Sequence, residues 1–358
     1  MKKILIIQNK RIGDVLIASI IPNNLKQIYP NSHITFFCYP YAAPVLWYNP
    51  NIDRVVTVKN KELKNLKNLF KIALQFRKEK FDIVVDPYVK IQSQFISLLS
   101  KAKMRVAFKK KVLPFAYTHQ IPILEERNST YGKAIDDRLN LLRSFSTKVS
   151  LDPFPKLFVL NEEVIKGKKL LQQYNIPSNK PVVMIGVLGS NASKSLPLPY
   201  IVSIVDYMTA YPVSILFNYI PSQKSKVDKI YQSLQRKENV HIDLIGKDIR
   251  EFIVIMNQCS LLVANEGGTV HIAKALSKPT FTIYSPYVER TTWATFEDKE
   301  EHTSIHLKDF KPELFIDKSE KNARKLSSHL YKELSPELIL PALKAFLKKQ
   351  FPEQSDNS

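Results

Sequence analysis

The sequence predicts an α/β protein built from two doubly wound, Rossmann-like domains. Short runs of β-branched residues alternate with amphipathic segments of helix length, which is the pattern of βαβ units in a parallel sheet. The chain has 358 residues, which suits two domains of roughly 150 residues each better than one core. The alternation breaks at residues 150–161 (SLDPFPKLFVLN), where two prolines and the loss of periodicity predict a linker.

The first predicted domain covers residues 1–155. Crossovers between successive parallel strands are right-handed, so its helices are expected on both faces of the sheet. The expected strands are residues 3–8, 33–39, 54–58 and 82–87, and the expected helices begin at about Asp14 and span residues 61–79.

The second predicted domain covers residues 156–330 and repeats this pattern. Its expected strands are 181–188, 214–219, 240–246, 261–266 and 280–285, and its expected helices follow Pro197, span 222–236 and 248–259, and begin at about Thr269. The remaining residues, 331–358, contain a helix whose apolar positions share one face, namely 338, 339, 343, 346 and 347. We expect Pro341 to kink this helix and the helix to pack back across the first domain.

Composition excludes several classes of protein. The apolar content of 44% and the charged content of 24% are those of an ordinary globular protein. Cys38 and Cys259 lie in separate apolar runs, so we expect two buried thiols rather than a disulfide or a metal site. No apolar run has the length of a membrane span, and the N-terminal residues indicate a first strand rather than a signal peptide, so a cytoplasmic protein is expected.

The positive charge is concentrated in the first half of the chain. The net charge is +20, and residues 1–150 hold 26 Lys and Arg against 10 Asp and Glu. Any single basic cluster is most simply a solvated face, but the asymmetry indicates that the first domain faces an anionic partner. Charge alone does not distinguish an anionic substrate or membrane surface from nucleic acid.

Three segments that follow predicted strands carry candidate site residues, because ligands of open α/β sheets bind beyond the carboxyl ends of the strands. The first is residues 11–25 (RIGDVLIASIIPNNL), where Gly13 permits a tight turn and Asp14 begins a helix. Asp14 is a candidate for chemistry, and it is equally suited to capping that helix.

The second segment, residues 264–286, places adjacent glycines between a strand and a helix. Gly267 and Gly268 let a ligand approach the backbone, and the N–H groups of Thr269, Val270 and His271 lie at the positive end of the helix dipole, which suits a diphosphate. Glu266 is positioned to accept hydrogen bonds from sugar hydroxyls. His271 has a supporting role at most, since a histidine inside a helix is usually part of the core.

The third segment, residues 186–201, ends a strand in a turn of small residues before Pro197. Lys194 can reach a phosphate as a point charge, and Ser190 and Asn191 can add hydrogen bonds. A loop lysine is usually just solvated, but this one follows a strand of the domain that holds the two glycines. The chain has no G-x-G-x-x-G after its first strand, no P-loop, no H-E-x-x-H and no acidic pair for a metal, so dehydrogenase, kinase and metalloprotease functions are not supported.

Taken in order, the RIGDVL segment, the Lys194 to Pro197 step and NEGGTVHIAKAL followed by IYSP resemble glycosyltransferase family 9, the lipopolysaccharide heptosyltransferases. The resemblance covers residues 3 to about 290. It implies a GT-B fold, with two Rossmann-like domains facing a cleft, the acceptor on the first and the nucleotide sugar on the second. By the family pattern Asp14 is the general base, Lys194, Gly268 and Thr269 hold the donor diphosphate, and Glu266 contacts the transferred sugar.

The resemblance also implies an inverting reaction without metal or cofactor, with ADP-heptose as the default donor. The sequence departs from the family pattern at Glu266, where aspartate is more common, at Leu196, where an aromatic is usual, and at Asn218, where glycine is usual. These departures leave the donor sugar open. Two other functions also remain open, a nucleotide-sugar epimerase or hydrolase of the same fold and a basic nucleic-acid-binding protein.

The basic first domain suggests that the protein binds an anionic glycolipid acceptor, and not nucleic acid, at the cytoplasmic face of the inner membrane. We expect the protein to act as a monomer. The acceptor-binding candidates are Arg11, Gly13, Lys64 and Arg105. Further lysines that could flank the acceptor are Lys59, Lys61, Lys67, Lys101, Lys103, Lys109, Lys110 and Lys111.

Overall fold

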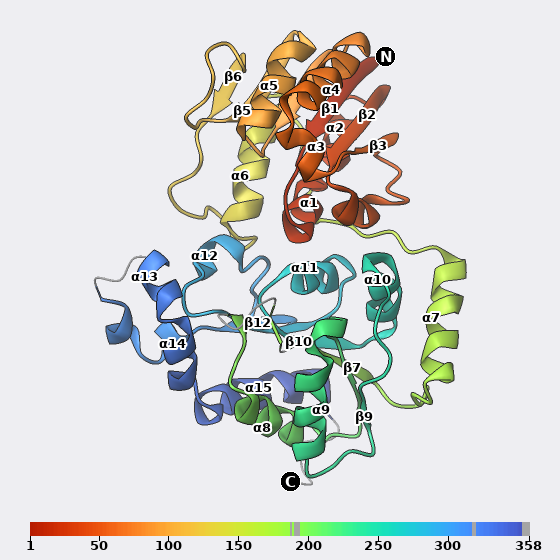
Figure 1. Cartoon of the computed structure of the whole chain (residues 1–358), viewed down its shortest axis with the longest axis vertical. Helices are drawn as coiled ribbons and strands as arrows, with labels where there is room; N and C mark the ends of the chain where they lie inside the picture. Colours follow the sequence, from red (N-terminus) through yellow and green to blue (C-terminus); the bar gives the residue numbers. More distant parts are fainter. Residues whose placement is uncertain (187, 190–193, 317–319, 353–358) are drawn as a thin grey trace. The chain divides into compact units, whose positions relative to one another are not determined.

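The computed structural model describes residues 1–186, 188–189, 194–316 and 320–352. The chain divides into two compact units, Met1–Phe158 and Val159–Ser358, and the division falls within the predicted linker (Figure 1). Both units are α/β, as predicted. Across the described residues, no helix combines the length and the apolar character needed to cross a bilayer.

The first unit contains a six-stranded parallel sheet in the order β3-β2-β1-β4-β5-β6. Its strands are β1 Lys2–Ile7, β2 Ser32–Cys38, β3 Arg54–Thr57, β4 Ile83–Asp86, β5 Met104–Phe108 and β6 His119–Ile121. The central strand β1 pairs with both β2 and β4, so the direction of winding reverses between β1 and β4. A switch point of this kind opens a crevice at the carboxyl ends of the two strands.

The helices of the first unit are shorter than the sequence suggested. The expected helix at 61–79 is two helices, because Asn65 is extended and its side chain accepts a hydrogen bond from the backbone N–H of Asn68, which caps the second one. The helix near Asp14 also ends early, at Ala18, and a new one starts just before Pro22. The helices are α1 Ile12–Ala18, α2 Ile20–Ile28, α3 Asn60–Lys64, α4 Leu66–Lys78, α5 Ile91–Ser100 and α6 Lys133–Leu142, with a 3-10 helix at Pro40–Leu46.

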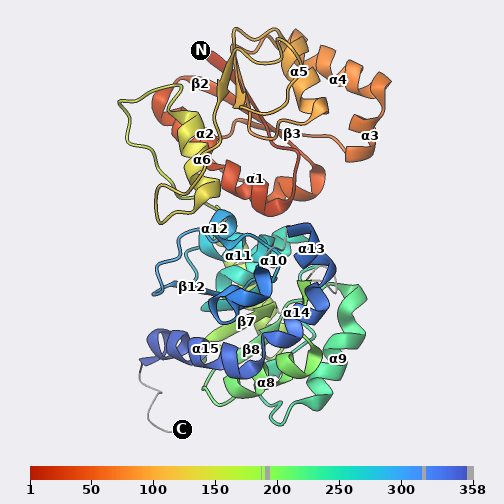
Figure 2. The same cartoon turned by 90° about the vertical axis from the view of Figure 1, so that its left-hand side faces the viewer.

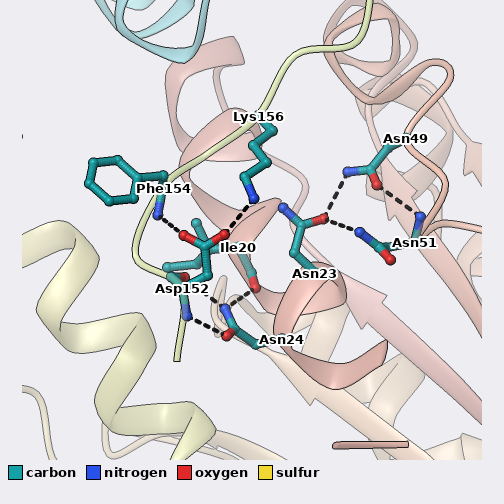
Figure 3. A network of polar contacts seen from close by, with 8 residues as sticks. All are labelled: Ile20, Asn23, Asn24, Asn49, Asn51, Asp152, Phe154 and Lys156. Carbon is teal, nitrogen blue, oxygen red and sulfur yellow. Dashed lines mark hydrogen bonds and ion pairs between the residues drawn. The ribbon is translucent and has the colours of Figure 1, made fainter. Parts of the chain in front are cut away.

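The linker leaves the first unit at a buried side-chain anchor (Figure 3). The amide of Asn24 donates to the carbonyl oxygens of Ile20 and Asp152, both at 2.8 Å, and accepts from the backbone N–H of Asp152 at 2.7 Å. The carboxylate of Asp152 accepts from the N–H of Phe154 at 2.9 Å and pairs with Lys156 at 2.6 Å. Asn24 therefore satisfies the backbone of a segment that has no regular secondary structure.

The second unit has the same topology, in the order β12-β11-β10-β7-β8-β9, with every pair parallel. Its strands are β7 Val182–Gly186, β8 Ser214–Phe217, β9 Val240–His241, β10 Leu261–Asn265, β11 Thr280–Ile283 and β12 His302–Ile305. Its helices are α7 Asn161–Gln173, α8 Leu198–Met208, α9 Lys224–Ser233, α10 Ile249–Gln258, α11 Gly268–Ala275, α12 Arg290–Trp293, α13 Glu320–Lys325, α14 Ser327–Glu333 and α15 Pro336–Gln350, with 3-10 turns at Pro221–Gln223, Leu307–Asp309 and Pro312–Phe315. The strand expected over 240–246 is only two residues long.

The C-terminal helix α15 belongs to the second unit, so the prediction that it packs back across the first domain is wrong. Its apolar face is buried in the core of the second unit, where the ring of Phe346 lies 5.8 Å from that of Phe281 on β11. The apolar face of this helix was predicted correctly. The sequence does not show against which apolar surface of the protein that face packs. The helix runs unbroken through Pro341, which lies in its second turn.

Candidate active site

In the second unit, two segments remote in sequence meet at the switch point between β7 and β10. The ammonium of Lys194, in the loop after β7, lies 2.6 Å from Oε1 of Glu266, the residue after β10. Both side chains are largely buried, at 14% and 10% exposure. Asn265 donates to the carbonyl oxygen of Lys194 at 2.9 Å, which holds the loop against β10. The structure thus brings together two residues that the sequence singled out separately.

A buried hydrogen-bonded chain supports Glu266 from behind. The hydroxyl of Ser285, just after β11, donates to Oε1 of Glu266 at 2.9 Å, and it also lies 2.9 Å from the hydroxyl of Tyr331 on α14. Burial raises the pKa of Tyr331, and the nearby Glu266 charge raises it further, although the Ser285 hydrogen bond opposes this. Ser285 and Tyr331 therefore hold the carboxylate in one orientation, and no sequence pattern indicates this role.

Tyr287 adds an aromatic surface that also contacts two cations. Its ring centre lies 5.8 Å from the ammonium of Lys194 and 5.6 Å from the guanidinium carbon of Arg324. Its hydroxyl is buried and has no hydrogen-bond partner among the described residues. A buried hydroxyl without a partner, close to charged side chains, is an atom whose hydrogen bond a ligand could supply.

The glycine turn leaves open space at the start of α11. Gly267 is the N-cap, in an extended conformation, and a Cβ atom built on it meets nothing within 4 Å. Packing within the chain therefore does not require glycine there, whereas the close approach of a ligand would. Gly268 and Thr269 begin the first turn of the helix, and the backbone N–H groups at a helix N-terminus favour an anion. His271, at the end of this turn, is half-buried.

The loop before Lys194 has its own steric requirement. A Cβ atom on Gly189 would lie 2.1 Å from the carbonyl oxygen of Lys194, so only glycine fits. The Gly189 N–H donates to Oγ of Ser195 at 3.0 Å, and the Gly189 carbonyl oxygen accepts from the side-chain amide of Gln223 at 2.9 Å. The predicted phosphate contacts Ser190 and Asn191 lie outside the described residues.

In the first unit, Asp14 is in the first turn of α1 and its side chain is buried. It pairs with Lys10, with Nζ 2.8 Å from Oδ1. The N-cap is Arg11, whose side chain makes no capping bond, so Asp14 does not cap the helix. Gly13 lies inside the helix rather than in the tight turn that the sequence suggested. Asp14 thus stands at the carboxyl end of β1, as predicted, with a cation at its side.

A cluster of cations surrounds this position, and most of its members were missed. Burial lowers the pKa of Lys110, and the positive charges of Lys10 and Lys90 lower it further; Arg138 acts in the same direction and Asp86 opposes it. We call these four cations, Lys10, Lys90, Lys110 and Arg138, the basic cluster. Because neighbouring cations make it harder for Lys110 to hold its proton, an anion bound among them would be favoured.

Buried polar atoms without partners lie beside the basic cluster. Among the described residues, Nε of Arg138, Oε1 of Gln8 and Oδ1 of Asn9 have no hydrogen-bond partner, and all three side chains are buried. Burial lowers the pKa of Arg138, while the charge of Asp14 raises it. Gln8 and Asn9 directly follow β1, so the polar atoms in need of partners gather at the same edge as Asp14.

Of the other predicted acceptor residues, Arg105 does not face a ligand, and its prediction is corrected. Its guanidinium donates to three carbonyl oxygens, those of Ala116 at 3.0 Å, Ala102 at 2.6 Å and Phe115 at 2.9 Å, so it fastens the chain around β5 instead of facing a ligand. Lys64 is exposed at the end of α3. Arg11 is exposed beside Asp14.

Two Rossmann-like units, each with reactive polar groups at its switch point, define the GT-B class of α/β protein. A model of glycosyltransferase family 9 (heptosyltransferase) matches residues 69–324. The chain belongs to this family and is a glycosyltransferase.

Known relatives agree with this assignment. The chain is 24% identical over 290 residues to lipopolysaccharide heptosyltransferase 1 of Campylobacter coli, with 79% of this chain and 83% of the relative covered. In fold it is similar to the family 9 glycosyltransferase of Veillonella parvula, with a TM-score of 0.78, 19% identity and 97% of each chain covered. It is also similar to the E. coli ADP-heptose LPS heptosyltransferase II, with a TM-score of 0.68, 14% identity, and 93% and 99% of the two chains covered.

Proposed function

We propose that this glycosyltransferase moves a sugar, heptose by family default, from a nucleoside diphosphate to the core of lipopolysaccharide, with inversion and without a metal ion. One observation carries the proposal: the ion pair of Lys194 and Glu266 stands beside the open N-terminus of α11. An anion-binding helix end, a cation and a carboxylate are the groups needed to hold a diphosphate and an adjoining sugar. The names of the relatives support ADP-heptose as donor and a lipopolysaccharide acceptor.

The second unit acts on the leaving group in this proposal. As the bond between the anomeric carbon and the phosphate oxygen breaks, its electron pair passes to the nucleoside diphosphate. The N–H groups of Gly268 and Thr269 and the ammonium of Lys194 stabilise that growing charge. Glu266 accepts hydrogen bonds from hydroxyls of the transferred sugar, and the bonds behind it fix its orientation. These positive groups take the place of a metal ion.

The first unit supplies the nucleophile. Asp14 removes the proton from an acceptor hydroxyl while the hydroxyl oxygen forms the new bond to the anomeric carbon, and a single displacement of this kind inverts that carbon. An acid group of the acceptor binds the basic cluster and competes for Lys10, which frees the Asp14 carboxylate for its role as base. The 2.8 Å pairing of Lys10 with Asp14 fits a base that is held until an anionic acceptor arrives.

The acceptor in this proposal is an anionic glycolipid, and the protein acts as a monomer at the cytoplasmic face of the inner membrane. The net charge of residues 1–150, 26 basic against 10 acidic side chains, supports an anionic partner for the first unit. The basic cluster replaces Lys64 and Arg105 as the predicted contact for its acid groups.

The test is nucleotide release from ADP-, GDP- and UDP-sugars, measured with and without lipooligosaccharide and with and without a chelator. Transfer predicts release that requires the acceptor and persists in the chelator. Turnover without acceptor would instead indicate an epimerase or hydrolase. Tight, salt-dependent RNA or DNA binding with no turnover of any donor would indicate the nucleic-acid-binding alternative.

A further inference from the structure

We propose that residues 59–71, which we call the α3–α4 elbow, dock this protein on an anionic lipid bilayer. The segment holds five lysines and one glutamate, and all five lysines are exposed. Within the described part of the chain no ion pair uses them. They are Lys59, Lys61, Lys64, Lys67 and Lys71.

The elbow also exposes large apolar side chains among these lysines. Leu66 is 79% exposed and Phe70, one turn later on α4, is 49% exposed. Leu69, Ala73 and Phe76 are buried in the core on the adjoining face of α4. The contacts of the helix with the core therefore do not depend on the exposed Leu66 and Phe70. A helix with one face in the core and a second apolar strip flanked by lysines has the chemistry of an interfacial membrane contact.

The apolar surface continues onto the neighbouring helix. The ring of Phe70 lies 6.4 Å from that of Phe95 on α5, and Ile91, the first residue of α5, is 55% exposed. Figure 2 shows α3, α4 and α5 grouped in the first unit. A nucleic acid would pair its phosphates with the lysines but would bury little of the exposed Leu66 and Ile91. The combination of lysines with exposed apolar side chains therefore favours a bilayer.

The position of the elbow connects it with the site. Helices that link parallel strands run antiparallel to them, so α4 and α5 both begin at the carboxyl edge of the first sheet, where Asp14 lies. Lys90, the N-cap of α5, belongs to the basic cluster and directly precedes the exposed Ile91. A bilayer at the elbow would therefore present a glycolipid head group beside the basic cluster, an inference that rests on the proposed function.

The experiment is co-sedimentation of the full chain with vesicles of phosphatidylcholine, with or without phosphatidylglycerol, at several salt concentrations. We expect binding only to the anionic vesicles and a loss of binding as salt rises. Leu66→Ser with Phe70→Ser should weaken binding at least tenfold, and Lys67→Gln with Lys71→Gln should weaken it about fivefold per lysine. All four side chains are exposed, so the variants should fold, which circular dichroism checks.

A matched control lies on α7 of the second unit, where Ile165, Lys168 and Lys169 are also exposed. Ile165→Ser and Lys168→Gln with Lys169→Gln should bind vesicles as the parent does. The proposal is overturned if the parent protein does not bind anionic vesicles, or if the elbow and α7 variants lose vesicle binding equally. It is also overturned if only the lysine variant loses binding and RNA competes with the vesicles.

A second assay separates this proposal from the proposed function. With a deacylated, water-soluble acceptor the elbow variants should keep the parent's turnover, whereas with acceptor embedded in anionic vesicles they should lose it. Vesicle binding without any sugar transfer would overturn the proposed function alone. Transfer to the embedded acceptor that is insensitive to the elbow variants would overturn the docking surface alone.

Discussion

The hydroxyl groups of Ser285 and Tyr331 lie 2.9 Å apart, and both side chains are almost completely buried. Ser285 also donates to Glu266, so Tyr331 on α14 is linked through Ser285 to the carboxylate of the proposed donor site. Buried hydroxyls that bond to each other and to a carboxylate form a network whose members depend on one another. Helix α14 therefore helps to hold Glu266 in place as well as contributing to the fold.

Tyr331→Phe should raise the KM for the nucleotide sugar several-fold, because Ser285 loses its partner and holds Glu266 less firmly. The stability cost should be about 1 kcal/mol, that of one buried hydrogen bond. Steady-state kinetics against donor concentration measures the effect. Tyr200→Phe is the control, since it removes a hydroxyl that bonds at 2.9 Å to the nearby Lys332 carbonyl without touching Glu266. An equal change of KM in both variants would contradict the positioning role.

Lys194→Gln should weaken binding of the nucleoside diphosphate and lower kcat about a hundredfold, because the leaving group loses its point charge. It also leaves Glu266 largely buried without its cation, at a cost of about 1–3 kcal/mol. The double variant Lys194→Gln, Glu266→Gln should recover that stability without recovering nucleotide affinity, measured by denaturation and by calorimetric titration. If the double variant regained affinity, the lysine would serve only to neutralise Glu266.

Asp14→Asn should fold normally, bind the donor nearly as well as the parent and lose roughly 10²–10⁴-fold in kcat, the range of positioned proton transfer. The amide keeps the size of the carboxylate but cannot accept the acceptor's proton. Single-turnover sugar transfer measures the chemical step, and donor titration supplies the control. Substantial turnover in this variant would reassign the base.

The fold and the positions of Lys194 and Glu266 after two strands could be predicted because both follow from short-range sequence patterns. Lys194 and Glu266 each follow a β-rich run, and adjacent parallel strands necessarily bring their carboxyl ends together. The same argument placed Asp14 at the end of β1. The pattern could not show that Lys10, four residues before Asp14, pairs with it. A single lysine in a basic segment looks like every other lysine there.

The surroundings of Asp14 were harder to predict, for a physical reason. Lys110 lies in the loop after β5, and Arg138 lies on α6, which is separated from β6 by an irregular stretch where no hydrophobic periodicity fixes the path of the chain. In the sequence, Arg105 is one of several basic residues and nothing distinguishes it from them. In the structure, its guanidinium donates hydrogen bonds to three backbone carbonyl oxygens and is not available to a ligand. The docking of α15 likewise depends on which of several apolar surfaces is complementary, and composition does not encode that choice.

Two buried histidines predict how stability depends on pH. Burial, with the charge of Lys274, lowers the pKa of His302 to about 4, and burial, with the charge of Arg290, lowers that of His306 to about 4. Nδ1 of His306 accepts a hydrogen bond from the N–H of Lys308 at 2.9 Å, so protonation removes an acceptor as well as placing a charge in the interior. Both side chains are therefore neutral in the folded protein near neutral pH.

The direction in which pH changes the free energy of unfolding follows from proton linkage. In the unfolded chain these histidines bind protons below about pH 6.5, whereas the folded protein resists until about pH 4, so the unfolded state is favoured as pH falls through that window. The free energy of unfolding should be flat above about pH 7 and then decrease by up to about 1.4 kcal/mol per pH unit for each histidine. Urea titrations between pH 7 and 5, above the range in which ordinary carboxylates titrate, measure this slope. His306→Asn keeps a side-chain acceptor for Lys308 and should remove about half of the slope, and adding His302→Gln should remove most of the remainder; a slope unchanged in the double variant would show that other groups carry the acid sensitivity.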